Sequence, residues 1–157
     1  MKIAMLRWPF VLLALLLLSA CGPGTKLQPP AASIQQLQVL PNGAWQLTLR
    51  IENYSYDTGM HVYAVDADLD LDGKRAGHVS VSPDLDIPAM TADVATATLT
   101  PEAQARSALA DAKGNAIAYE LKGSLSAGKG ESGSARSFDL DGKGYISPVP
   151  GIANTWR

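Results

Sequence analysis

The feature that most constrains the fold of this chain is an alternation of apolar and polar residues with a period of two. In the stretch AWQLTLRI every second side chain is large and apolar: Trp45, Leu47, Leu49 and Ile51. Successive side chains of a β-strand point to opposite faces, so this pattern indicates a strand with one buried face. The stretch AIAYELKGSL, residues 116–125, repeats the pattern. The two stretches favour a fold built on sheets.

Shorter alternating stretches complete the predicted set of strands. They cover residues 34–40, 63–71, 78–82, 94–99 and 134–141. One segment departs from the pattern: Thr100 as N-cap, Pro101 at the first helical position and Gly114 as a stop predict a helix over 101–112. We therefore expect a mainly β fold, an antiparallel immunoglobulin- or fibronectin-III-like β-sandwich of about seven strands with one short α-helix.

The stretch DADLDLDGKRAG, residues 66–77, allows two interpretations. Its acidic residues are spaced two apart: Asp66, Asp68, Asp70 and Asp72. Counted from Asp68, they match the first ligands of a calcium-binding EF-hand loop, but Val79 stands where that loop needs a bidentate glutamate. In a strand, the acids would instead form a polar stripe opposite an apolar face: Tyr63, Val65, Ala67, Leu69 and Leu71.

The strand interpretation accounts for more of these residues, because Asp72-Gly73 is also a strong hairpin signal. We predict a solvated acidic stripe that is partly neutralised by Arg50, Lys74 or Lys122 on neighbouring strands. Weak binding of a divalent cation at the stripe is the alternative.

The N-terminal segment carries the features of an export signal. Basic Lys2 and Arg7 precede an apolar run, and the 13 uncharged residues of 8–20 fall short of the span of about 20 that a transmembrane helix needs. The run ends in a sequence that resembles the bacterial lipobox: Leu18, Ser19, Ala20 and Cys21. Cys21 is the single cysteine, and acylation explains its presence in a secreted chain that can form no internal disulfide. An ordinary secretory signal is the alternative.

These features predict four segments. Residues 1–20 form a cleaved lipoprotein signal peptide, 21–33 a lipidated N-terminus and tether, 34–146 the sandwich domain, and 147–157 a C-terminal tail. At about 3.3 Å per residue, the tether could hold the domain up to about 40 Å from the lipid. Gly22 follows the cysteine where inner-membrane lipoproteins typically carry Asp, so by resemblance we expect the inner leaflet of the outer membrane, facing the periplasm.

The charge balance argues against nucleic acid as a partner. Removing Lys2 and Arg7 with the signal peptide lowers the 13 basic residues to 11 and leaves the 15 acidic residues unchanged. A mildly acidic chain lacks the dense basic face on which binding to nucleic acid depends. We expect contact with the membrane through the lipid anchor, and with another envelope protein as a further partner.

The order of these segments resembles the late embryogenesis abundant group 2 family, whose domain is also called the water stress and hypersensitive response (WHy) domain. The correspondence runs from Ile34 to Leu125 and includes LTLRIENYS, LDLDGKRAG, DIPAM, TATLT and AYELKGSL. The family usually has Asn-Pro-Asn where this chain has Asn53-Tyr54-Ser55, so the proline is lost, while Asn53 is expected to keep the backbone hydrogen bonds of that corner. The resemblance implies a sandwich with one helix and a role in desiccation and stress tolerance, protecting other proteins without catalysis.

No set of residues points to catalysis or to a cofactor. His61 and His78 lie in strand-like stretches without the spacing of a metal site, and the glycines of 128–133 precede no helix that binds phosphate. We therefore predict no catalytic residues, no bound metal, no cofactor and no small-molecule substrate. A pocket that combines either histidine with a perturbed carboxylate would support an enzyme instead.

Several large side chains fall around one predicted loop and either fill the core or contact a partner: Tyr54, Tyr56, Met60 and Tyr63. Trp156, near the C-terminus, carries the same two alternatives. We expect a non-enzymatic lipoprotein that binds or shields envelope molecules under stress. The alternative is a structural or assembly subunit of an outer-membrane or envelope complex, which holds its partner by strand addition or through the tyrosine loop.

Overall fold

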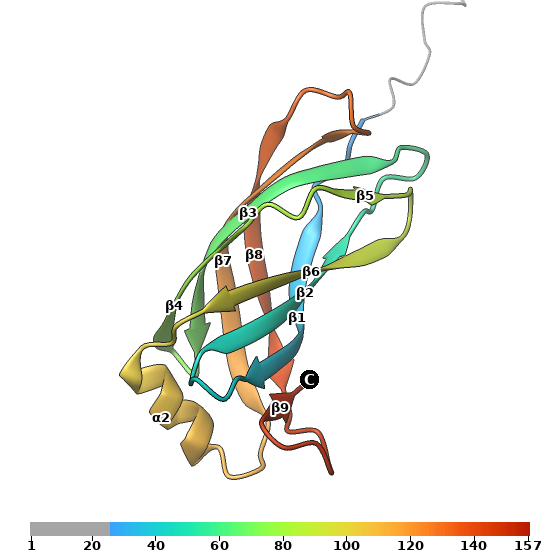
Figure 1. Ribbon diagram of the computed structural model, residues 1–157. Coiled ribbons are helices and arrows are strands. Elements are labelled where there is room, and N and C mark those ends of the chain that lie inside the picture. Colours follow the sequence, from blue (N-terminus) through green and yellow to red (C-terminus); the bar gives the residue numbers. More distant parts are fainter. Residues whose placement is uncertain (1–25) are drawn as a thin grey trace, which may run out of the picture.

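The computed structural model describes residues 26–157, which form two antiparallel sheets and one helix (Figure 1). The strands are β1 (Ala31–Val39), β2 (Trp45–Glu52), β3 (Met60–Leu71), β4 (Lys74–Val81), β5 (Leu85–Ile87), β6 (Ala92–Leu99), β7 (Ile117–Lys129), β8 (Arg136–Ile146) and β9 (Thr155–Trp156). The helix is α2 (Ala103–Asp111). This confirms the predicted mainly β sandwich with one short helix.

The strands are divided between the sheets in an order that brings distant segments together. One sheet has the order β6-β2-β1-β9, and the other has the order β4-β3-β7-β8, with β5 paired to the N-terminal end of β3. All seven predicted strands are present, while β5 and β9 were not predicted. These two strands are only three and two residues long, too short to show a period.

The core lies between the sheets and is filled mainly by the alternating apolar residues. The inward side chains of β2 are at most 1% exposed: Trp45, Leu47, Leu49 and Ile51. Burying one such side chain stabilises the fold by about 1.5–3 kcal/mol before entropic costs. The sheets also meet at their edges, where a Cβ at Gly142 of β8 would overlap the carbonyl oxygen of Ala32 in β1. Tyr119 of β7 joins them through its hydroxyl, which accepts the N–H of Ile34 at 3.1 Å.

The long strand β3 follows the predicted burial pattern in its C-terminal half and departs from that pattern in its N-terminal half. Val65, Ala67, Leu69 and Leu71 are buried, as the strand interpretation predicts. The turn residues Asp72 and Gly73 have φ of +49° and +67°, so the predicted hairpin is confirmed. Tyr63 does not share the buried face, because a bulge between Val62 and Ala64 shifts the register and leaves its side chain only half-buried. The assignment of Tyr63 to that face was therefore wrong.

The helix lies within the predicted range, but its N-cap is Glu102 and not Thr100. The N–H of Glu102 donates to the carbonyl oxygen of Ala76 in β4 at 2.9 Å, so its backbone stays extended and the helix begins after it. Ala105 and Leu109 are buried against the sheets. The small side chains on this face let α2 lie close to β4.

The folded unit extends beyond the predicted bounds of 34–146 at both ends. Leu27 is buried, and the N–H of Gln28 donates to Ser55 Oγ at 2.9 Å. At the other end Trp156 pairs with Leu37, so this side chain packs back onto the sandwich. None of the helices formed by residues 26–157 has the length and apolar character to cross a bilayer. The predicted signal peptide, lipobox and Cys21 lie outside the described residues.

Candidate functional site

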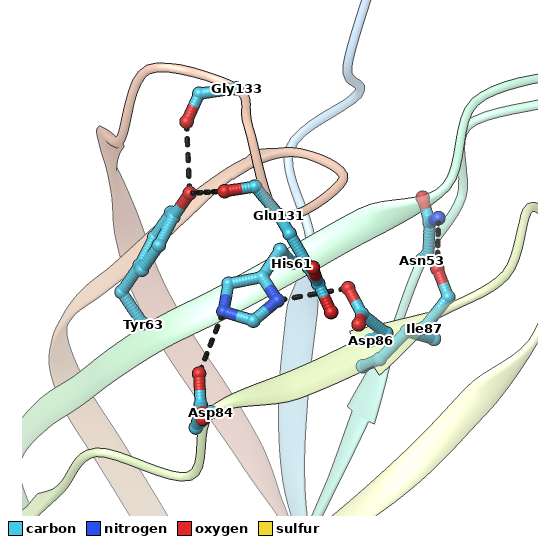
Figure 2. A network of polar contacts seen from close by, with 8 residues as sticks. All are labelled: Asn53, His61, Tyr63, Asp84, Asp86, Ile87, Glu131 and Gly133. Carbon is cyan, nitrogen blue, oxygen red and sulfur yellow. Dashed lines mark hydrogen bonds and ion pairs between the residues drawn. The ribbon is translucent and has the colours of Figure 1, made fainter.

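The two histidines occupy matching arrangements, which we call histidine clamps: each ring contacts two aspartates that are two residues apart on an adjacent segment. In the His61 clamp, Nδ1 lies 2.8 Å from Asp86 Oδ1 and Nε2 lies 3.1 Å from Asp84 Oδ1. His61 is on β3, directly opposite Asp86 on β5, and Asp84 immediately precedes β5. Figure 2 shows the ring between the two carboxylates.

The surroundings of His61 favour its charged form. The side chain is only 7% exposed, whereas Asp84 and Asp86 are 90% and 55% exposed. The hydrogen bond to Asp86 raises the pKa of His61, the negative charges of Asp86 and Asp84 add to this, and burial of the ring opposes it. Only the imidazolium has two N–H donors, so it alone can donate to both carboxylates. Both ring nitrogens of His61 are then engaged by carboxylates.

Aromatic contacts complete the surroundings of His61. The Tyr63 ring lies 4.6 Å from the His61 ring, centroid to centroid, with an interplanar angle of 59°. The Tyr63 hydroxyl donates to the carbonyl oxygen of Gly133 at 2.8 Å and lies 3.3 Å from that of Glu131 (Figure 2). The predicted partner-contact residue Tyr63 therefore joins β3 to the β7–β8 hairpin.

The His78 clamp repeats the arrangement on the surface. His78 of β4 lies opposite Asp68 of β3, with Nδ1 3.0 Å from Asp68 Oδ1 and Nε2 3.1 Å from Asp66 Oδ1. All three side chains are about half exposed. Hydrogen bonds to Asp68 and then Asp66 raise the pKa of His78. The hydrogen bond from His78, followed by one from Arg75 at 2.8 Å, lowers the pKa of Asp68.

These contacts account for much of the acidic stripe. Asp66 and Asp68 hold His78, Asp70 lies opposite Arg75, and Asp72 is in the turn instead of the strand. The prediction that Arg50 neutralises the stripe was wrong, because Arg50 lies in the other sheet and pairs with Glu52 at 2.9 Å.

The other two predicted neutralising residues lie near the stripe without bridging it. Lys122 of β7 lies opposite Asp68 of β3, but its ammonium group contacts Glu120 at 2.6 Å. Lys74 is opposite Leu71, just after the turn. Within the described part of the chain, no three or more His, Cys, Asp or Glu side chains are grouped so as to hold a metal ion.

Asn53 organises the loops beside the His61 clamp. Its side chain is 1% exposed, and Nδ2 donates toward the carbonyl oxygens of Thr58, Ile87 and Pro88 at 2.9, 3.1 and 3.2 Å. Its Oδ1 accepts the N–H of Ser55 at 2.9 Å. One amide therefore joins the β2–β3 loop to the segment after β5, and Asn53 keeps the backbone hydrogen bonds expected of it.

The tyrosines predicted to contact a partner do not form one cluster. Tyr54 is 52% and Tyr56 is 87% exposed in the β2–β3 loop, whereas Met60 is buried and Tyr63 is half-buried. The Tyr54 hydroxyl donates to Glu52 Oε2 at 2.6 Å, and this bond raises the pKa of Tyr54. Core filling therefore applies to Met60 and in part to Tyr63, and Tyr54 and Tyr56 remain available for contact.

A cleft of about 760 Å³ lies at the other end of the molecule, beside α2. Its lining includes Asp72, Lys74, Asp111 and the 74%-exposed Tyr145, with alanines between them. Neither histidine lines it. The combination of a pocket, a histidine and a perturbed carboxylate is therefore not assembled in this cleft.

No protein-family model and no curated protein matches the sequence. Among solved structures, the chain is similar to a solution structure from Arabidopsis thaliana, with 17% identity and a TM-score of 0.53 over 86% of this chain and 92% of the other. A crystal structure from Archaeoglobus fulgidus has 9% identity and a TM-score of 0.43, covering 79% and 98%. An X-ray structure of a structural-genomics target has 12% identity and a TM-score of 0.44, covering 80% and 91%. What the Arabidopsis structure shares with this chain is the fold.

Proposed function

We propose that this protein is a non-enzymatic lipoprotein, anchored by Cys21 to the inner leaflet of the outer membrane, whose sandwich binds or shields envelope molecules during desiccation or osmotic stress. The observation that carries the anchor is the sequence Leu18-Ser19-Ala20-Cys21, in which Cys21 stands six residues before Leu27, the first buried residue of the part that the structure describes. Two or three acyl chains hold a protein at a bilayer because each buried methylene contributes about 0.8 kcal/mol.

The resemblance to the late embryogenesis abundant group 2 family supports the stress role. The matching segment LTLRIENYS forms most of β2 and the corner organised by Asn53, and LDLDGKRAG forms the turn end of the β3–β4 hairpin. A non-catalytic role is supported by the engagement of both ring nitrogens of His61 and of His78 by carboxylates. These contacts give each histidine a structural role in joining neighbouring strands.

Acylation is tested by expressing the full-length chain with a labelled fatty acid in a bacterium that has an outer membrane. We expect label on the wild-type protein and none on the Cys21→Ser variant. Equal labelling of the two would refute the anchor. An unlabelled wild-type protein that is nevertheless cleaved and exported would indicate an ordinary secretory signal.

The protective role is tested with the acylated protein in detergent micelles. A labile enzyme is dried or frozen with it, and with an equal mass of albumin in the same detergent. We expect higher recovered activity with the lipoprotein. Recovery no better than with albumin would count against shielding of proteins, whatever the result for acylation.

A structural subunit of an envelope complex is the second candidate, and the cleft beside α2 favours it. The helix α2 lies at the end of the sandwich away from the entering chain (Figure 1), and the exposed Tyr145 borders the cleft beside it. A photo-crosslinking residue at position 145 would capture one partner in stoichiometric amount if this candidate is correct. A photo-crosslinking residue at the exposed position 152 serves as the matched control.

A further inference from the structure

Two loops at the end where the chain enters the sandwich expose large apolar side chains. Tyr54 and Tyr56 are 52% and 87% exposed in the β2–β3 loop, and Met90 is 60% exposed in the turn between β5 and β6. We call these three residues the loop tip. Two backbone hydrogen bonds join the loops. The N–H of Met90 donates to the carbonyl oxygen of Ser55 at 3.1 Å, and the N–H of Asn53 donates to the carbonyl oxygen of Thr91 at 2.9 Å.

One residue of the loop tip, Met90, has a strained backbone conformation. Met90 has φ of +57°, a region that glycine enters freely and that other residues enter with strain. The surrounding hydrogen bonds of Asn53 fix this turn, yet they give the Met90 side chain no buried position. Strained backbone positions occur at many functional sites. This turn holds the apolar side chain of Met90 in solvent.

The entering chain is fastened to this same tip. The N–H of Gln28 donates to the hydroxyl of Ser55, which lies between Tyr54 and Tyr56. Cys21 is seven positions before Gln28, and seven residues span at most about 25 Å even when fully extended. This is well below the reach of about 40 Å expected for a tether over 22–33. A lipid on Cys21 thus keeps the tip near the bilayer, while α2 and the C-terminus lie at the opposite end (Figure 1).

The chemistry of the tip suits the headgroup region of neutral lipids. Tyrosine combines an apolar ring with a hydroxyl that stays hydrated, which is why it is enriched at membrane interfaces. Methionine is flexible and apolar, so it can pack among irregular chains. Charge does not favour anionic lipid: Glu52 and Asp57 border the tip, and Arg50 is already paired with Glu52.

We propose that Tyr54, Tyr56 and Met90 insert into the headgroup region of the same bilayer that holds Cys21, so that the sandwich stands on the membrane by this end. This inference rests on the proposed lipid anchor and adds a second, non-covalent contact to it. The contact fixes the orientation of the domain, and the cleft beside α2 then faces away from the membrane.

The experiment uses the full acylated protein in phosphatidylcholine vesicles. A polarity-sensitive dye is attached at Met90→Cys, and in a separate variant at Tyr56→Cys, which avoids the strained position. Tyr145→Cys at the far end is the matched control, since it is similarly exposed. Flotation with the vesicles reports the anchor, and quenching by lipids spin-labelled at the headgroup reports insertion.

Insertion predicts a shift of dye emission to shorter wavelength, with quenching, at positions 56 and 90 and neither effect at 145. Protein that floats but gives the same aqueous emission at all three positions overturns the insertion and leaves the anchor standing. Failure to acylate or to float overturns both. Insertion that requires added anionic lipid would show that the contact is electrostatic and would contradict a tip suited to neutral lipid.

Discussion

The two histidine clamps use the same chemistry in surroundings of very different exposure. In each, an imidazole spans two aspartates at positions i and i+2, yet the side chain of His61 is 7% exposed and that of His78 is 49% exposed. Water and salt can replace the partners of an exposed ion pair, so such a pair contributes little to stability. A buried polar group has no such replacement. Burial therefore decides which of the two clamps the fold depends on.

The direction of the pKa shifts sets how each clamp responds to pH. Both histidine pKa values are raised above the ordinary value of about 6.5. The stabilisation from each clamp is then fully present below about pH 6.5 and is lost as pH rises through the folded-state pKa. The clamps are expected to differ in how sensitive this stabilisation is to salt.

The largest expected effect is from His61→Ala. At about pH 6 it removes a buried cation that joins β5 to β3, and we expect it to lower the free energy of unfolding by about 2 kcal/mol. Urea unfolding followed by circular dichroism measures this. The matched variant His78→Ala is expected to unfold close to wild type. Equal losses for the two variants would show that burial does not separate the clamps.

Next in size is the pH dependence itself. Wild-type stability is expected to fall above about pH 6.5, as the pH rises through the raised folded-state pKa values of the two histidines. Glutamine keeps hydrogen-bonding capacity without charge, so His61→Gln and His78→Gln are each expected to remove the part of this slope that comes from the raised pKa of the histidine replaced. Thermal unfolding at several pH values measures the slopes. A slope that survives unchanged when both histidines are replaced would assign the pH dependence to other groups.

A smaller effect distinguishes the two aspartates within each clamp. Asp86→Asn is expected to lower the pKa of His61 more than Asp84→Asn, because the hydrogen bond to Asp86 is the main cause of the shift. For His78, Asp68→Asn is expected to have a larger effect than Asp66→Asn. Histidine ring resonances followed by NMR give the four pKa values. The reverse order in either clamp would contradict the geometry described.

The smallest expected effect is that of salt. Raising NaCl to about 1 M shortens the screening length to about 3 Å, so the pKa of exposed His78 is expected to move toward its ordinary value. The pKa of His61 is expected to change less, because its ring is covered by protein. The same NMR titration at low and high salt tests this. Equal salt sensitivity would mean that water reaches both rings alike.

Local patterns in the sequence predicted most of the framework. Seven strands were found from their alternation, and the Asp72-Gly73 hairpin from its turn residues, because both signals depend only on neighbouring positions. The start of α2 was misplaced because a long-range bond to Ala76 keeps Glu102 extended. Of the tyrosines proposed for contact, Tyr54 and Tyr56 are exposed. Tyr63 lies at a bulge, and its hydroxyl joins β3 to the β7–β8 hairpin.

The clamps show what the tertiary structure alone decided. A regular two-residue hairpin at Asp72-Gly73 would place His78 opposite Ala67, on the inner face. A bulge after Leu69 shifts the pairing by one residue, so His78 lies opposite Asp68 on the surface. His61 meets Asp86 through β5, a strand too short to be recognised. Alternation determines which residues a strand buries, but the partner that each side chain meets depends on register, and register is set by contacts between segments distant in the chain.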